Sequence, residues 1–191
     1  MTLPNLISFS GCEMSGRKTA ADVMAQRAGY VKTYMAKPIE QLLVKLDPWI
    51  VDHRGGTIER FSDLYGSLSD YALKDFDEVR RLLRVVEDEV GRRNGQNLWT
   101  DLIFEEVQAL LDIEKKVAVA GVRHKEELDL VRTKDGVCVW INRDVKYRSS
   151  LDSVSSDDCD VVVENNGTVK DLYINVVTAL EEYDSNNKEE E

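Results

Sequence analysis

A short apolar segment near the N-terminus leads into two glycines separated by four residues, and this arrangement constrains the fold more than any other feature. Leu6–Phe9 is predicted to be a strand, and Gly11 and Gly16 then form the spacing Gly-x-x-x-x-Gly. A predicted helix, Thr19–Ala28, follows directly. This order places successive backbone N–H groups and the positive end of a helix around one anion. The sequence therefore predicts a phosphate-binding loop.

The residue after the second glycine departs from the usual pattern of such loops. In G-x-x-x-x-G-K-[S/T] a lysine at that position reaches the β- and γ-phosphates, whereas here the position holds Arg17, with Lys18 next. Arginine keeps the positive charge, but its planar guanidinium is not equivalent to a compact ammonium group. Phosphate binding and phosphate transfer are therefore separate questions for this chain.

Strands alternate with helices at both ends of the sequence, and the middle is helical. The predicted strands are Leu6–Phe9, Val31–Met35, Val117–Ala120, Val137–Ile141 and Asp160–Val163. This alternation predicts an α/β fold in three layers, a parallel sheet flanked by helices, in one domain of residues 1–180. Residues 47–112 are predicted to be a helical insertion, and residues 181–191 an acidic, disordered tail.

Charge and cysteine content narrow the class of protein. The 191 residues include 36 acidic and 25 basic ones, for a net charge of −11, so bulk charge does not attract nucleic acid. The cysteines at 12, 138 and 159 lack metal-ligand spacing and are expected to be reduced thiols in a cytoplasm. No apolar run approaches membrane-spanning length, and no signal-peptide pattern is expected at the N-terminus.

Four segments, in this order, carry a family resemblance. They are the opening strand and loop, residues 77–83 with 89–92 and 97–99, residues 117–127, and residues 163–172. Together they resemble the deoxynucleoside monophosphate kinases of tailed bacteriophages, a branch of the adenylate-kinase-like phosphate-loop kinases. The resemblance implies transfer of the ATP γ-phosphoryl group to a deoxynucleoside monophosphate with Mg²⁺, in the cytoplasm of an infected host if the protein is phage-encoded. Small-molecule nucleotides are the implied partners, and a homodimer is compatible with the sequence.

The same resemblance assigns roles to individual residues. The implied donor-phosphate residues are Gly11, Ser15, Gly16, Arg17, Lys18 and Thr19. The implied catalytic cations are Arg17, Lys18 and Arg123, and Glu127 matches the family's acid after the same strand. The implied acceptor-site residues are Arg80, Arg81, Arg92 and Arg143, with residues 47–112 as the substrate-binding region and residues 144–156 as a lid. No residue is assigned to a metal.

Several departures from the family pattern fall at positions that would take part in chemistry. Besides Arg17, Gly121 stands where the family has an aspartate that helps hold the metal, and Glu87-Asp88 replaces a glycine–threonine pair. A structural alternative also exists for Arg80 and Arg81, because acidic residues on the same helix could pair with them at i, i+3 or i, i+4.

Three functional hypotheses follow. The first is an active deoxynucleotide kinase in which Arg17 or Lys18 replaces the loop lysine. The second is a degenerate kinase that binds nucleotide or a protein partner without turnover, which the loss of both the lysine and the aspartate favours. The third is a kinase acting on a modified base within DNA, and the net charge of −11 counts against it.

Overall fold

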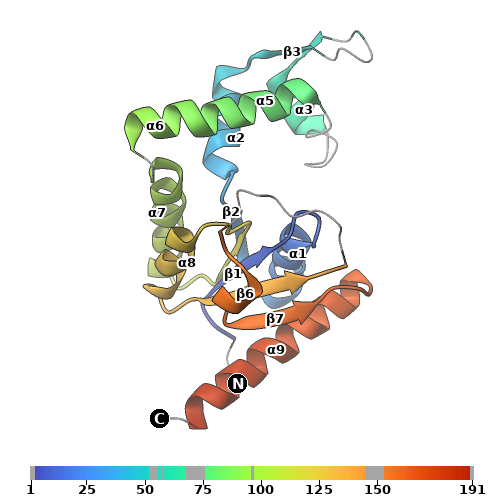
Figure 1. Cartoon of the computed structure of the whole chain (residues 1–191), viewed down its shortest axis with the longest axis vertical. Helices are drawn as coiled ribbons and strands as arrows, with labels where there is room; N and C mark the ends of the chain where they lie inside the picture. The colour runs from blue at the N-terminus through green and yellow to red at the C-terminus, as the bar shows by residue number, and fades with distance from the viewer. Residues whose placement is uncertain are drawn as a thin grey trace. The chain divides into compact units, whose positions relative to one another are not determined.

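A parallel sheet forms the centre of the first of two compact units, and its strands lie in the order β2-β5-β1-β6-β7 (Figure 1). The computed structural model describes residues 3–51, 56, 58–67, 76–95, 97–144 and 153–189. The strands are β1 (Leu6–Gly11), β2 (Val31–Tyr34), β5 (Val117–Ala120), β6 (Val137–Asn142) and β7 (Val161–Glu164). The first unit comprises residues 1–35 and 104–191, and the second comprises residues 36–103.

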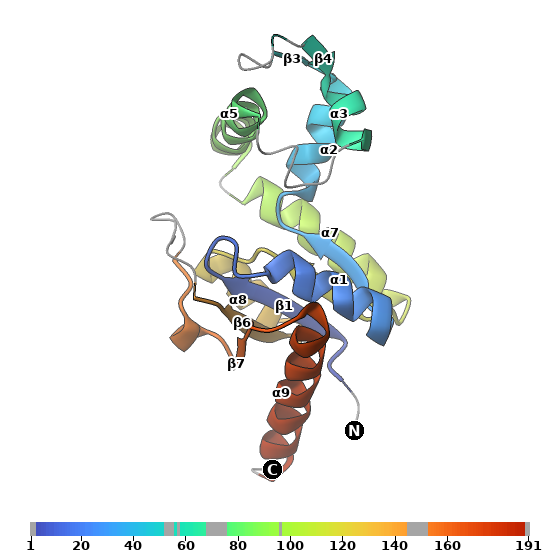
Figure 2. The same ribbon diagram turned by 90° about the vertical axis from the view of Figure 1, so that its right-hand side faces the viewer.

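Helices cover both faces of this sheet. Helices α1 (Arg17–Ala28) and α9 (Val169–Glu189) pack on one face, where Phe9, Met24 and Leu180 belong to a single buried cluster. Helix α8 (Lys125–Arg132) packs against β1 and β6, and Figure 2 shows it behind the strands, with α1 and α9 in front. The prediction of an α/β fold with a parallel sheet between helices is confirmed.

The burial of the strands explains why they form a parallel sheet. All residues of β1 and β5 are buried, so both faces of these strands need apolar or hydrogen-bonded side chains. The register pairs Phe9 with Ala120 on one side and with Val139 on the other. The carboxyl ends of β1, β5, β6 and β7 therefore lie along one edge of the sheet, and the segments after them are brought together there.

The second unit is smaller and mainly helical. Its helices are α2 (Lys37–Leu46), α3 (Phe61–Ser67), α5 (Asp77–Val85), one π-helical turn η1 (Val86–Val90), α6 (Gly91–Asn94) and the start of α7 (Leu98–Asp112). Its core contains Leu43, Ile50, Phe61, Val79 and Val86. The predicted insertion at residues 47–112 thus corresponds to a compact unit with different bounds, residues 36–103.

A hairpin in this unit was not predicted. Strands β3 (Trp49–Val51) and β4 (Ile58–Arg60) pair antiparallel, and α3 begins directly after them at Phe61. Polar contacts with Asp47 close the hairpin: Arg60 Nη1 donates to the Asp47 carbonyl at 2.9 Å, and Ser62 N donates to its carboxylate at 3.0 Å. Strands of three residues are too short to show a period in the sequence, which is why the pattern did not reveal them.

The prediction that residues 181–191 form a disordered tail is wrong as far as Glu189, because α9 continues to that residue. Leu180 is fully buried and Tyr183, one turn later, packs against the same core cluster, so the helix is held by tertiary contacts beyond its predicted end. Residues 190–191 lie outside the described part of the chain, as do residues 145–152 of the predicted lid. Across the described residues, no helix combines the length and apolarity needed to cross a membrane.

The packing of α9 gives a stability prediction. Leu180→Ala should lower the free energy of unfolding by about 2–5 kcal/mol, since it removes a fully buried side chain and leaves a cavity. Ile174→Ala, on the exposed side of the same helix, should cost less than about 0.5 kcal/mol. Urea unfolding followed by circular dichroism measures both, and equal losses would contradict the described packing of α9.

Candidate phosphate-binding site

The segment between β1 and α1 has the backbone conformation of a tight anion-binding loop. Gly11 has φ 141° and Gly16 has φ 104°, values that glycine adopts without steric cost. A Cβ at Gly11 would lie 2.5 Å from the Ile141 carbonyl oxygen and 2.6 Å from Ser15 Oγ. Gly11 is therefore required both by its conformation and by the close approach of β6 and of the loop's own serine.

Helix α1 begins directly after this loop with its N-terminus uncapped. Gly16 is the N-cap and offers no side-chain hydrogen bond, and the first turn of the helix contains no acidic residue. The first N–H groups of a helix lack partners within the helix and carry partial positive charge, so they attract an anion. The site thus has the electrostatics that a phosphate group needs.

Ser15 adds a second indication of a ligand at the loop. Ser15 is completely buried, and its Oγ has no hydrogen-bond partner among the described residues. A buried hydroxyl without a partner costs free energy, and native structures rarely keep one without a reason. A phosphate bound in the loop would give the Ser15 hydroxyl the hydrogen-bond partner that it lacks among the described residues.

Asn165, after β7, holds the loop from the side. Its Nδ2 donates to the Ser15 carbonyl at 2.7 Å, and its backbone N donates to the Asn142 carbonyl at 2.7 Å. The side-chain amide occupies the space where a Cβ of Gly16 would lie, so Gly16 must lack a side chain for this contact to exist. Sequence reasoning placed Asn165 in a family segment but gave it no role. A polar residue following a strand at the loop's edge of the sheet is the signal that could have revealed it.

The two cations after Gly16 have different surroundings. Arg17 is the first residue of α1, and its Nη1 nitrogen is buried. The Lys18 ammonium lies 4.5 Å from the ring centroid of Tyr34 on β2, a cation–π contact. Strand β2 is at the edge of the sheet, separated from β1 by β5. Lys18 is therefore engaged with a strand that does not lead into the loop.

The residues after β5 lie at the same edge of the sheet. Gly121 has φ 84°, donates its N–H to the Phe9 carbonyl at 3.0 Å, and has open space where a Cβ would stand. Glu127 accepts hydrogen bonds from the backbone N–H groups of Arg123 (2.7 Å) and His124 (3.1 Å), so it caps the start of α8. Glu127 thus has a structural role in this chain.

The remaining predicted cations divide between the two units. Arg143 is exposed directly after β6, at the loop edge of the sheet, while Arg80 and Arg81 belong to α5 in the second unit. Arg92 lies in α6, and its side chain is outside the described part of the chain.

Arg80 and Arg81 form ion pairs along their own helix. Arg80 pairs with Asp77, and Arg81 makes a two-pronged contact with Glu78, at 2.8 Å from Nε and 2.7 Å from Nη2. An open cavity of about 360 Å³ lies along this helix. Its charged lining consists of Asp77, Arg80, Arg81, Arg84, Asp88 and Glu89. Three arginines against three carboxylates leave this lining with no net formal charge, so the cavity does not itself attract an anion strongly.

The residues described fit a phosphate group better than they fit a metal ion. Among them, no group of three or more histidine, cysteine, aspartate or glutamate side chains could hold a cation. Gly121 offers no carboxylate where the resemblance implies one, and we assign no residue to Mg²⁺. ATP phosphates, in contrast, match the glycine loop, the uncapped helix and the buried Ser15 hydroxyl.

Comparison with solved structures places this geometry in a known architecture. The chain is similar to a gluconokinase from Sinorhizobium meliloti 1021, with TM-score 0.52 and 12% identity over 100% of this chain and 99% of that one. It is also similar to a dephospho-CoA kinase from Campylobacter jejuni, with TM-score 0.50 and 14% identity over 96% and 98% of the two chains. The chain therefore shares the fold of these two kinases, a parallel sheet flanked by helices.

A sequence relative exists among viral proteins. The chain is 21% identical, over 191 aligned residues, to a candidate deoxynucleotide monophosphate kinase of Acanthamoeba polyphaga mimivirus. The match covers 92% of this chain and 96% of that protein. No family model matches the chain.

The contact between Asn165 and the loop gives a second prediction. Asn165→Ala should lower the free energy of unfolding by about 1–2 kcal/mol, because it leaves the buried Ser15 carbonyl without its hydrogen bond. Asn166→Ala is the matched control: it changes an exposed neighbour and should cost less than about 0.5 kcal/mol. Chemical denaturation of both variants measures the difference, and a neutral Asn165→Ala would show that the loop does not depend on this contact.

Proposed function

We propose that this protein is a nucleotide kinase that transfers the γ-phosphoryl group of ATP to a deoxynucleoside monophosphate, giving ADP and a deoxynucleoside diphosphate. The observation that carries the proposal is the loop from Gly11 to Gly16, which ends at an uncapped helix and contains Ser15, whose buried hydroxyl has no hydrogen-bond partner in the described part of the chain. The mimivirus relative supports the substrate class, since the name of that protein states deoxynucleotide monophosphates.

For phosphoryl transfer, the protein mainly has to position the two substrates and supply positive charge. An oxygen of the acceptor phosphate attacks the γ-phosphorus of ATP, and the bond to the oxygen bridging the β- and γ-phosphorus breaks. Such transfers are catalysed mainly by holding the groups in line and by neutralising developing negative charge. The loop N–H groups would hold the donor phosphates, and Arg17 would supply the charge next to them. Arg123 follows β5 and Arg143 follows β6, the two strands on either side of β1, at the same edge of the sheet.

Arg17 is the stronger candidate than Lys18 for the role of the loop lysine. It occupies the position directly after the second glycine and has a buried head-group nitrogen. The Lys18 ammonium already lies against Tyr34. A guanidinium in this position can contact two phosphate oxygens at once, which partly offsets its poorer fit to a loop built for an ammonium group.

A nucleotide-binding protein without turnover is the second candidate. Two observations favour it: Gly121 provides no side chain beside the loop, and Arg80 and Arg81 are already paired with acids of their own helix. A kinase acting on a base within DNA has weaker support, since the chain carries a net charge of −11. For either nucleotide function we propose a cytoplasmic protein, because its three cysteines are free thiols.

Incubation with ATP, Mg²⁺ and each of the four deoxynucleoside monophosphates tests the proposed reaction. We expect diphosphate from at least one monophosphate, measured by chromatography. Arg17→Ala should reduce kcat/KM by about 10²–10³-fold, as expected for loss of one charge-stabilising group. Lys18→Ala, the adjacent cation, should change it by less than about tenfold.

Absence of turnover with all four acceptors would refute the kinase proposal. If ATP still raised the melting temperature, the binding-only alternative would be supported instead. Arg17→Lys with Gly121→Asp should then create activity. The Gly121 site has open space for the new side chain, and aspartate tolerates a positive φ better than most residues.

A further inference from the structure

Two cysteines far from the phosphate loop in sequence have their sulfur atoms close together. Cys138 lies in β6 and Cys159 lies two residues before β7, 21 positions later, and their Sγ atoms are 2.8 Å apart. Both are free thiols in the structure. Cys138 is buried, whereas Cys159 is half-buried, so Cys159 is the more exposed residue of the pair.

The backbone holds the two residues in this position. Cys138 N donates to Asp160 Oδ2 at 2.7 Å, and Asp160 N donates to the Cys138 carbonyl at 3.0 Å. The residue that follows Cys159 is therefore fixed to the backbone of Cys138 in both directions. These two hydrogen bonds keep the backbones of Cys138 and Cys159 close together.

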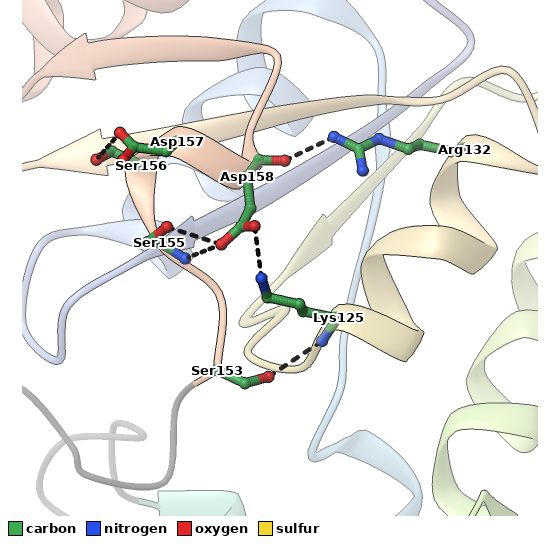
Figure 3. Close-up of polar contacts among 7 residues, drawn as sticks. All are labelled: Lys125, Arg132, Ser153, Ser155, Ser156, Asp157 and Asp158. Atoms are coloured by element: carbon green, nitrogen blue, oxygen red, sulfur yellow. Dashed lines mark hydrogen bonds and ion pairs between the residues drawn. The ribbon is translucent and has the colours of Figure 1, made fainter.

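The residues before Cys159 are also anchored, as Figure 3 shows. The Asp158 carboxylate accepts a hydrogen bond from Lys125 Nζ at 2.8 Å, and the Asp158 carbonyl accepts one from Arg132 Nη2 at 2.6 Å. Helix α8 therefore holds this turn through two side chains. Ser155 donates to the Asp158 carboxylate from its backbone N (2.8 Å) and its hydroxyl (2.7 Å). Cys159 thus extends from a closed, ion-paired turn and keeps its sulfur against Cys138.

We propose that Cys138 and Cys159 form a redox-active dithiol, which closes to an intramolecular disulfide when a peroxide reaches it. Loss of one proton leaves a thiolate and one S–H shared by two adjacent sulfurs, and the thiolate is the reactive form of cysteine. The half-buried Cys159 attacks one oxygen of hydrogen peroxide, the O–O bond breaks, and the leaving hydroxide takes up a proton to give water. Cys159 is then a sulfenic acid.

The second step completes the disulfide. Cys138 Sγ attacks Cys159 Sγ, the S–O bond breaks, and the departing hydroxide takes the thiol proton of Cys138 to give a second water. Two thiols and one peroxide thus yield one disulfide and two waters. The modification does not depend on the proposed kinase activity, and the third cysteine, Cys12 in the loop, takes no part in it.

The test uses the full chain carrying Cys12→Ser, so that the two remaining thiols are the ones in question. After reduction and removal of the reductant, the folded protein is treated with hydrogen peroxide. We expect the number of free thiols to fall from two to zero and the intact mass to fall by two hydrogen atoms. A peptide map should show the Cys138 and Cys159 peptides joined, and dithiothreitol should reverse the change. The cross-link should raise the melting temperature by about 5–10 °C.

A matched variant separates pairing from general oxidation. Cys12→Ser with Cys159→Ser leaves Cys138 alone and buried, and its thiol should survive the same treatment. Retention of both thiols in the first protein would overturn the proposal. A gain of oxygen mass without linked peptides, or a disulfide between two molecules, would overturn it equally. The peptide map is made on the Cys12→Ser protein, which keeps Cys138 and Cys159. Its result therefore remains valid even if the Cys159→Ser control fails to fold.

Discussion

The hydrogen bond from Asn165 to the Ser15 carbonyl is the contact on which the candidate site depends. It joins residues 150 positions apart, and it holds the exit of the last strand against the loop that follows the first. The absence of a side chain at Gly16 allows the amide to approach, and the direction of the loop then aims the first N–H groups of α1. A phosphate site built from backbone groups has no side chains to adjust, so its precision must come from contacts of this kind.

Sequence reasoning reached the fold because the fold follows from local patterns. The strands of the sheet are short, apolar and separated by amphipathic helices, and such runs indicate a parallel sheet. The same reasoning failed where tertiary contacts determine the secondary structure. It missed the hairpin that Asp47 stabilises, and it ended α9 before Tyr183, whose packing against the core extends the helix. For the site, glycine spacing revealed the loop. Asn165 was given no role, because an asparagine after a strand is also a common turn residue.

Several of the basic side chains contact other residues of the protein, so their number alone overstates the positive charge open to a ligand. Arg81 is held by Glu78 and the Lys18 ammonium lies over Tyr34, so part of the basic side chains is already committed within the protein. Arg17, at the start of α1, and Arg143, after β6, flank the edge of the sheet where the loop lies. Any anion that binds the arginines of α5 must displace the carboxylates that already pair with them.

The position of Asn165 also has a consequence for the order in which the protein is made. A ribosome releases the loop residues early, whereas the strand and turn that support them emerge about 150 residues later. Strand β1 lies between β5 and β6, which both come much later in the chain, so the centre of the sheet closes only through long-range contacts. Such contacts slow folding because the entropy of closing a long loop is lost before they form. The loop can therefore gain its hydrogen bond from Asn165 only after the strand that precedes Asn165 has been synthesised.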